Sequence, residues 1–156
     1  MAISLRETRD SDLPVFWEYL TDPRFQYMAA ATRKYHYDRG HFDQYWARVR
    51  ADPSVLLRTV LSDGAVAGYA AVNGPSCERE VSYVVGRPHW GRGVASRALA
   101  ALIGLEDSRP LLATAAADNA GSLRVLEKSG FVVTGHGRSW AQARGQEIDI
   151  VHLSLG

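Results

Sequence analysis

The sequence predicts an α/β fold of the α+β kind, with a mixed, mostly antiparallel sheet, and two observations carry this prediction. Two runs of apolar and β-branched residues, 54–61 and 65–72, are joined by an Asp-Gly dipeptide, which is a strong β-hairpin signal. A third run, 78–85, follows and then leads through glycines into a pattern of helical spacing that extends to Ile103. We therefore expect three antiparallel strands followed by a strand–loop–helix unit.

Length and composition restrict the class of protein. A chain of 156 residues is long enough for one domain with a sizeable core. The 18 basic and 17 acidic residues nearly cancel, which gives no reason to expect a nucleic-acid or membrane partner. No apolar run reaches about 18 residues and no leader pattern opens the chain, so we expect a cytoplasmic location. A single cysteine, Cys77, permits neither an internal disulfide nor a metal site of its own, and no metal is expected.

The N-terminal segment predicts a strand followed by a helix. The strand is expected over residues 3–7. The helix is expected to begin near Ser11 or Asp12, either of which could cap it, with Pro14 in its first turn. The Asp-Pro pair at 22–23 is expected to end it. Its apolar stripe consists of Val15, Phe16, Tyr19 and Leu20.

An aromatic-rich region follows this helix. Residues 24–37 show no clear periodicity, so we expect them to be irregular. A second helix is predicted over 39–50, with Asp38 near its start. Two interpretations of the region remain open: a mobile, aromatic-lined cover over a substrate site, or helices that cap the sheet with aromatic core residues. The large side chains on one face of the second helix are Phe42, Tyr45, Trp46 and Val49.

The C-terminal third predicts one more helix between strands. A strand is expected over 111–117, and a helix capped by Asp118 or Asn119 is expected to continue to Lys128. Gly130 is a suitable stop for that helix. Two closing strands are then predicted over 131–135 and 148–155, with residues 136–146 as the turn or loop between them.

The loop between the third strand and its helix carries the strongest functional signal. It contains Trp90-Gly91-Arg92-Gly93. A strand that turns through glycines into a helix presents unpaired backbone N–H groups and the positive end of the helix dipole at one place. Phosphate groups bind readily there, and Arg92 adds a positive charge. We therefore predict a site for a phosphate-bearing ligand, the alternative being a tight turn whose glycines serve packing.

Two common phosphate loops fit this segment less well. The chain has no Gly-Lys-Ser/Thr ending, which a P-loop requires. A dinucleotide fingerprint is matched in part by Gly91, Gly93 and Ser96, with Asp118 after a later strand. However, a Rossmann unit starts with a βαβ segment, whereas an antiparallel meander is predicted before this loop.

The order of the predicted elements and two motifs resemble the GNAT superfamily of N-acetyltransferases over nearly the whole chain. The first motif runs from Glu80-Val-Ser-Tyr-Val-Val to His89-Trp-Gly-Arg-Gly-Val-Ala. It is similar to the acyl-CoA loop of the branch that includes ribosomal-protein alanine N-acetyltransferases, in which a Trp commonly precedes the glycines. The second motif is Asn119-Ala-Gly-Ser-Leu-Arg-Val-Leu-Glu-Lys-Ser-Gly-Phe. The resemblance implies a single N-acetyltransferase domain over 1–156, with helices on both faces of a GNAT-like sheet.

The same resemblance implies an activity. An acetyl group would pass from acetyl-CoA, as co-substrate, to a primary amine by direct attack in a ternary complex. The amine would belong to a small molecule or to a protein N-terminus, and the protein would be a monomer or a homodimer. An alternative from another class is a non-catalytic module that binds CoA as a sensor or structural subunit.

The residues implied in co-substrate binding lie in both motifs. The pantetheine arm would pair with the strand that ends at Val85, in the manner of an added strand. The pyrophosphate would meet the N–H groups of residues 91–95, and Arg124 and Lys128 would either approach the 3′-phosphate or remain solvated. The implied set is Tyr83, Val84, Val85, Trp90, Gly91, Arg92, Gly93, Val94, Ala95, Asn119, Ser122 and Lys128.

Two residues are implied in catalysis. Glu80 is expected to accept a proton from the amine, the alternative being a surface carboxylate in a cluster with Glu78 and Arg79. Many members of the superfamily carry a tyrosine acid where this chain has Leu126, which leaves Ser122 as the only hydroxyl on that helix face. Ser122 would hydrogen-bond the sulfur or relay a proton from water, or the thiolate would leave without a dedicated acid. Nothing around Cys77 suggests an activated thiol, so direct transfer is favoured over covalent catalysis.

Overall fold

The computed structural model of the chain describes residues 1–30 and 38–156. Its strands form one seven-stranded sheet in the order β1-β2-β3-β4-β5-β7-β6. Every neighbouring pair is antiparallel except β4 and β5, which are parallel, so the predicted mixed, mostly antiparallel sheet is confirmed. The strands are β1 (Ile3–Arg6), β2 (Leu56–Ser62), β3 (Ala65–Asn73), β4 (Arg79–Val85), β5 (Leu111–Ala116), β6 (Val132–Ala141) and β7 (Gln146–Leu155).

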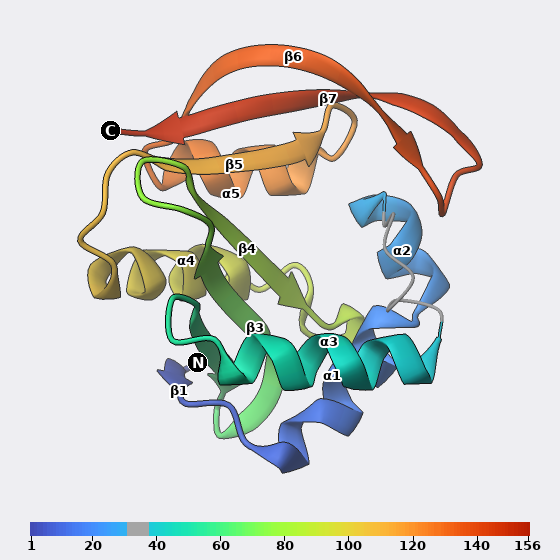
Figure 1. The fold of residues 1–156 in the computed structure, drawn as a ribbon, viewed down its shortest axis with the longest axis vertical. Helices are drawn as coiled ribbons and strands as arrows, with labels where there is room; N and C mark the ends of the chain where they lie inside the picture. Colours follow the sequence, from blue (N-terminus) through green and yellow to red (C-terminus); the bar gives the residue numbers. More distant parts are fainter. Residues whose placement is uncertain (31–37) are drawn as a thin grey trace.

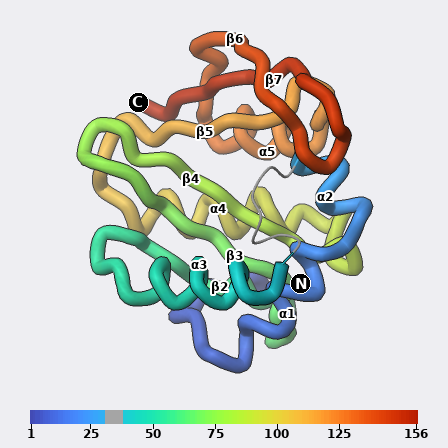
Figure 2. The backbone as a smooth tube through the Cα atoms, turned by 45° about the vertical axis from the view of Figure 1, so that its right-hand side comes forward, coloured from blue at the N-terminus to red at the C-terminus, as the bar shows by residue number. Residues whose placement is uncertain are grey.

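Helices cover both faces of the sheet. On one face lie α4 (Val94–Leu105) and α5 (Ala120–Lys128), and on the other lie α1 (Leu13–Leu20) and α3 (Arg39–Ala51) (Figures 1 and 2). A shorter helix, α2 (Pro23–Ala29), lies beside the turn end of the β6–β7 hairpin (Figure 1). Short 3₁₀ turns, η1 (Asp10–Asp12) and η3 (Arg87–His89), precede α1 and follow β4.

Each face of the sheet has its own hydrophobic core. The core under α4 and α5 is mainly aliphatic and includes Leu99, Leu102 and Leu126, each at most 1% exposed. The core under α1 and α3 is largely aromatic. Within it Trp46 packs edge-on against Tyr69, with ring centroids 4.8 Å apart. Phe42 and Trp46 are therefore core residues, as one of the two interpretations predicted. Tyr35 and Tyr37 lie outside the described residues.

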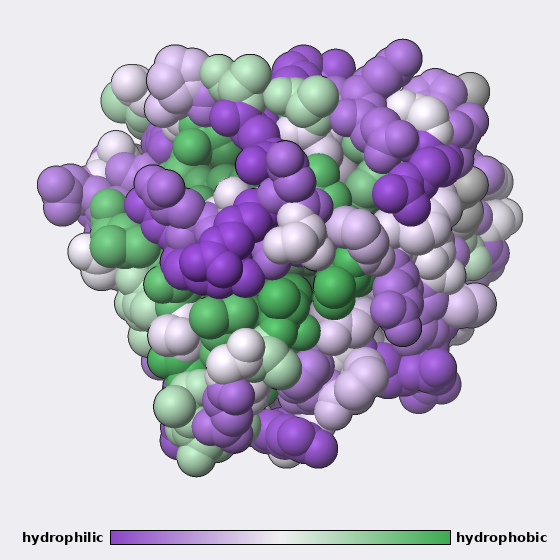
Figure 3. Space-filling view, turned by 90° about the horizontal axis from the view of Figure 1, so that it is seen from below, coloured by the Kyte–Doolittle hydropathy of each residue, from purple (hydrophilic) through white to green (hydrophobic). Residues whose placement is uncertain are grey.

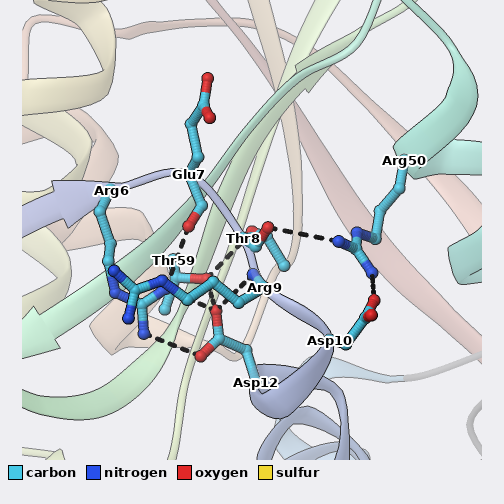
Figure 4. A network of polar contacts seen from close by, with 8 residues as sticks. All are labelled: Arg6, Glu7, Thr8, Arg9, Asp10, Asp12, Arg50 and Thr59. Carbon is cyan, nitrogen blue, oxygen red and sulfur yellow. Dashed lines mark hydrogen bonds and ion pairs between the residues drawn. The ribbon is translucent and has the colours of Figure 1, made fainter.

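The predicted capping hydrogen bond at the start of α1 is absent. Asp12 stands at the N-cap position, but its side chain makes no capping hydrogen bond and is buried instead. Its carboxylate accepts hydrogen bonds from both guanidinium nitrogens of Arg6 (2.7 and 2.8 Å), the backbone N–H of Arg9 and the hydroxyl of Thr59 (Figure 4). Asp12 thereby ties β1, η1 and β2 together. In the same region Arg50 of α3 pairs with Asp10.

Two segments predicted to be irregular are regular in part. Of the segment 24–37, residues up to 29 belong to α2, and residues 31–37 lie outside the described ranges. Residues 23–29 form α2, since Asp22 caps its N-terminus by accepting a hydrogen bond from the backbone N–H of Arg24, and Pro23 suits the first turn. The predicted loop over 136–146 is mostly strand, because β6 extends to Ala141, which pairs with Gln146. The glycine and polar residues of this segment gave no strand pattern in the sequence. Strand β6 tolerates them because it lies at the edge of the sheet.

Among the helices in the described ranges, none combines the length and the apolar character that crossing a bilayer requires. On the face seen from below, apolar side chains reach the surface in patches that are bordered by polar side chains (Figure 3).

Candidate active site

The site is built where β4 and β5 part. The two strands pair only at their first residues, Arg79 with Leu111 and Glu80 with Leu112. Beyond Glu80 the backbone of β4 continues to pair with β3 as far as Val85, but no longer with β5 (Figure 1). Each of these residues that does not bond to β3 therefore has its backbone N–H and C=O directed toward the side that β5 has left. This is an open strand edge inside a sheet.

The glycine loop continues from the end of this edge. Gly91 and Gly93 have φ values of 75° and 76°, in the left-handed region that glycine adopts without strain. A Cβ atom at either position would meet none of the described residues within 4 Å, so the backbone conformation, rather than packing, requires glycine here. Trp90 secures the loop, because its indole N–H donates to the carbonyl of Val85 at 2.7 Å.

The loop delivers the chain to an uncapped helix N-terminus. Gly93 is the N-cap of α4 and has no side chain to accept from the first-turn N–H groups. The first helical hydrogen bond joins the N–H of Arg97 to the carbonyl of Gly93, so the N–H groups of Val94 and Ala95 have no partner within the helix. Arg92 is exposed beside them. An anion placed here would meet N–H donors, a helix dipole and a cation.

Helix α5 brings the second motif to the same opening. Asn119 is its N-cap, and its Oδ1 accepts from the N–H of Ser122 at 3.2 Å. The Nδ2 of Asn119 donates to the carbonyl of Met28 in α2 at 3.1 Å, so the amide of Asn119 already has protein partners at both ends. Lys128 lies in the last turn of α5, at the opposite end from Asn119.

The hydroxyl of Ser122 meets a phenol from β4. The Oγ of Ser122 lies 2.9 Å from the hydroxyl oxygen of Tyr83. Burial raises the pKa of Tyr83, and the hydrogen bond with Ser122 opposes that shift. Leu126, one turn further along α5, is 1% exposed and belongs to the aliphatic core. The sequence motifs predicted Ser122 on this face, but nothing in them predicted that the Tyr83 hydroxyl would reach it.

Glu80 lies at the point where β4 and β5 separate. Val81 and Tyr83 belong to the core under α4 and α5, and Val84 to the core under α1 and α3, so by strand alternation Glu80 faces the α3 side. The side chain is exposed, and no residue of the described ranges hydrogen-bonds to it. Its neighbour Arg79 has a structural role, since its guanidinium donates to the carbonyls of Ser54 and Gly74 and pairs with Glu106.

A cluster that the sequence did not predict closes the α2 side. Arg144 lies in the β6–β7 turn, and its guanidinium carbon is 4.4 Å from the centroid of the Tyr27 ring. Its Nε–H donates to the Tyr27 carbonyl at 3.0 Å. It also pairs with Asp118 at 2.5 Å, and this hydrogen bond lowers the pKa of Asp118. The Arg144 side chain is 5% exposed, and among the described residues its Nη2 has no hydrogen-bond partner. These contacts join residues 26 and 117 positions apart, which no local pattern could indicate.

Among the described residues, no group of three or more His, Cys, Asp or Glu side chains is arranged to hold a metal ion. The hollow lined by Tyr45, Arg48 and Asn73 lies at the other end of the sheet, away from the glycine loop and Ser122, and Arg79 lies in its wall.

Comparisons with known proteins agree with this geometry. The model of the acetyltransferase (GNAT) domain family matches residues 3–132. An uncharacterised N-acetyltransferase, p20, from Bacillus licheniformis is 31% identical over 107 residues, which cover 65% of this chain and 60% of that protein. The spermidine N-acetyltransferase from Vibrio cholerae, solved with CoA and spermine, aligns with a TM-score of 0.84 at 15% identity, covering 98% of this chain and 94% of the other. A ribosomal-protein-alanine N-acetyltransferase from Brucella melitensis aligns with a TM-score of 0.81 at 23% identity. The alignment covers 99% of this chain and 98% of the other.

Proposed function

The chain belongs to the GNAT acetyltransferase family, and we propose that it transfers the acetyl group of acetyl-CoA to a primary amine by direct attack in a ternary complex. One observation carries the proposal: the open edge of β4 runs into the glycine loop and the uncapped start of α4. A thioester with a long amide-containing arm and a pyrophosphate matches an open strand edge that ends at an anion site.

The open edge of β4 would bind the pantetheine arm. Its amide groups would pair with unpaired backbone groups between Val81 and Val85, including those of Tyr83 and Val84, as an added strand does. The pyrophosphate would accept hydrogen bonds from N–H groups of residues 91–95, with Arg92 beside it. Trp90 would hold the loop in this geometry through its bond to Val85. Lys128 is exposed and would approach the 3′-phosphate.

The amine must lose a proton before it attacks. An alkyl amine with a pKa of about 10 is roughly 0.1% neutral at pH 7, so a proton acceptor at the site accelerates the reaction. Glu80 is our candidate, because it lies where the strands part and is exposed on the α3 side. A water molecule could join its carboxylate to the amine.

The transfer itself needs charge stabilisation. The amine nitrogen forms a bond to the carbonyl carbon and loses a second proton to water, while the C–S bond breaks and its electron pair goes to sulfur. Backbone N–H groups of β4 would polarise the carbonyl oxygen. Ser122 lies on the face of α5 that meets β4, where its hydroxyl would hydrogen-bond the departing sulfur.

The acceptor is proposed only as a primary amine. The Vibrio cholerae neighbour was solved with spermine, and the Brucella melitensis neighbour is named a ribosomal-protein-alanine N-acetyltransferase, so we keep both small and protein amines as candidates. The test is a panel of polyamines, amino acids, aminoglycosides and N-terminal peptides, incubated with protein and acetyl-CoA. Release of free thiol with an equal amount of acetylated amine supports the proposal. Tight CoA binding without product from any amine would favour a non-catalytic CoA-binding module, which the replacement of the usual helix tyrosine by Leu126 also allows.

A further inference from the structure

A tyrosine hydroxyl reaches α5 from the strand instead of from the helix. The ring of Tyr83 packs against the aliphatic core, and its hydroxyl oxygen lies 2.9 Å from Ser122 Oγ. A longer contact of 3.4 Å joins it to the carbonyl of Ser122. The contact bridges β4 and α5 beside the place where β4 and β5 separate. Two hydroxyl groups thus lie next to the open edge.

Either oxygen could donate in this bond, and the acidities of the two hydroxyl groups favour one direction. The N–H of Ser122 is used by Asn119, and within the described part of the chain the Ser122 hydroxyl has no other side-chain partner than Tyr83. A phenol is more acidic than an alcohol, so the favoured arrangement has Tyr83 donating and Ser122 Oγ accepting. The hydrogen of Ser122 then remains free to point into the opening between the strands.

Burial keeps the phenol protonated and so able to donate. The pKa of the Tyr83 phenol is raised by burial, and the hydrogen bond with Ser122 offsets this only in part. The phenol therefore keeps its proton at neutral pH and stays a donor.

We propose that Tyr83 is a positioning residue for acetyl transfer: its O–H donates to Ser122 Oγ and thereby aims the Ser122 O–H at the sulfur of CoA. This inference rests on the proposed function. It gives Tyr83 a side-chain role in addition to its backbone position on the open edge. The phenol hydroxyl reaches α5 from β4 and contacts the helix at Ser122, one turn before Leu126. Helix α5 itself has no tyrosine on that side.

The chemistry requires no net proton transfer through this pair. As the C–S bond breaks, its electron pair goes to sulfur, and the Ser122 O–H donates a hydrogen bond to the thiolate. The bond from Tyr83 to Ser122 polarises the Ser122 hydroxyl and strengthens that donation. The amine proton goes to the base or to water, and the thiolate later takes a proton from water.

The test measures the thiol of bound CoA and needs no acceptor. Free CoA is the probe, and the ionisation of its thiol is followed in the complex by thiolate absorbance against pH. In the wild type we expect the thiol pKa to lie below the value of about 8.5 that a cysteine-like thiol has in water. Ser122→Ala should raise it by about one to two units, as expected for loss of a hydrogen bond to an anion. Tyr83→Phe should raise it by about one unit, and the double variant no further than Ser122→Ala.

The controls separate positioning from folding. Tyr83→Phe keeps the buried ring, so thermal unfolding and CoA affinity at low pH, where the thiol is protonated, should match the wild type. Tyr19→Phe is the matched control, because its hydroxyl donates to the Val66 carbonyl and lies in α1 on the other face of the sheet. It should leave the thiol pKa unchanged.

The outcomes distinguish the two proposals. An unchanged thiol pKa in Tyr83→Phe, or shifts that simply add in the double variant, would overturn the role of Tyr83 and leave acetyl transfer standing. Failure of the wild type to bind CoA would overturn the proposed function and this inference together. With an amine identified by the panel, Tyr83→Phe should lower kcat by about tenfold while KM for acetyl-CoA changes little, which a loss of binding alone would not produce.

Discussion

Asn119 and Glu80 differ in how far their side chains are engaged by the rest of the protein. Asn119 uses both ends of its amide within the protein, toward Ser122 and Met28. A role for its side chain in binding the pantetheine arm therefore requires the arm to share or replace the bond to Met28. Glu80 has no such partner in the described ranges and is exposed at the point where β4 and β5 separate. A carboxylate in that position is available for proton transfer.

The role of Glu80 can be tested by removing only its proton acceptor. Glu80→Gln should lower kcat by roughly 10²-fold and leave CoA affinity nearly unchanged. The remaining rate should recover as pH rises, since neutral amine becomes more abundant. Glu78→Gln is the matched control, because Glu78 is an exposed carboxylate just before β4. Superimposable pH–rate profiles for wild type and Glu80→Gln would make Glu80 an ordinary surface residue.

Gly93 should matter for its conformation and for the space it leaves. At φ 76° an alanine is strained by about 1–2 kcal/mol, and its methyl group would project into the open space beside the N–H groups of α4. Gly93→Ala should therefore weaken CoA binding by at least tenfold in calorimetry, with the protein still folded. Gly104→Ala, within α4 and also free of steric contact, should bind CoA like the wild type. Equal affinities for both variants would remove the loop from the site.

At the scale of elements, α2 is held to the rest of the molecule by its C-terminal carbonyls. Those of Tyr27 and Met28 accept from Arg144 in the β6–β7 turn and from Asn119 at the start of α5. Helix α2 and the turn of the C-terminal hairpin thus lie side by side, although they are far apart in sequence (Figure 2).

Loss of Arg144 should release this junction. Arg144→Ala leaves Asp118 and the Tyr27 carbonyl without their partner, so we expect amide exchange in α2 to accelerate by about tenfold or more. KM for the amine should rise while CoA affinity holds. Arg138→Ala, in the same hairpin but paired with Glu147 and Asp149 of β7, is the control. Unchanged exchange in α2 would show that other contacts hold the helix.

The sequence predicted elements best where local chemistry determines them. The Asp-Gly turn at 63–64, the helix start beside Asp38, Asn119 of the two possible caps of α5, and the stop at Gly130 are confirmed, because each acts within a few residues of itself. Helix α2 and the outer half of the β6–β7 hairpin were missed. Their contacts, such as those of Arg144 with Tyr27 and Asp118, come from distant parts of the chain.

The same contrast holds for the site. The two motifs predicted the glycine loop and the start of α5. The separation of β4 from β5 depends on how the whole sheet pairs, so no local motif could predict it. The bond between Tyr83 and Ser122 crosses 39 positions and depends on how α5 packs on β4. For that reason the sequence suggested Ser122 and could not suggest its partner.

For the whole molecule, the buried carboxylate of Asp12 links stability to pH. Burial alone would raise its pKa, but hydrogen bonds from Arg6, Arg9 and Thr59 lower it from 3.8 to about 2. Because the folded value is the lower one, the stabilisation is complete above pH 3.8 and is lost as pH falls from 3.8 toward 2.

Asp12→Asn should therefore destabilise the fold by about 2 kcal/mol at neutral pH, with the difference disappearing near pH 2. Urea unfolding of both proteins across this range gives the comparison. Asp10→Asn is the control, since Asp10 pairs with Arg50 but its side chain is 93% exposed. A destabilisation that persists unchanged at low pH would assign the effect to packing instead of charge.

The central claim, that acetyl-CoA lies along the open edge of β4 with its pyrophosphate at the glycine loop, is tested most directly by amide hydrogen exchange of the wild-type protein with and without saturating CoA. The account predicts slower exchange in two segments, 81–85 and 91–95, because N–H groups in both would donate to the bound molecule. Strong CoA binding that leaves both segments unprotected, or that protects the hollow lined by Tyr45 and Asn73 instead, would contradict it.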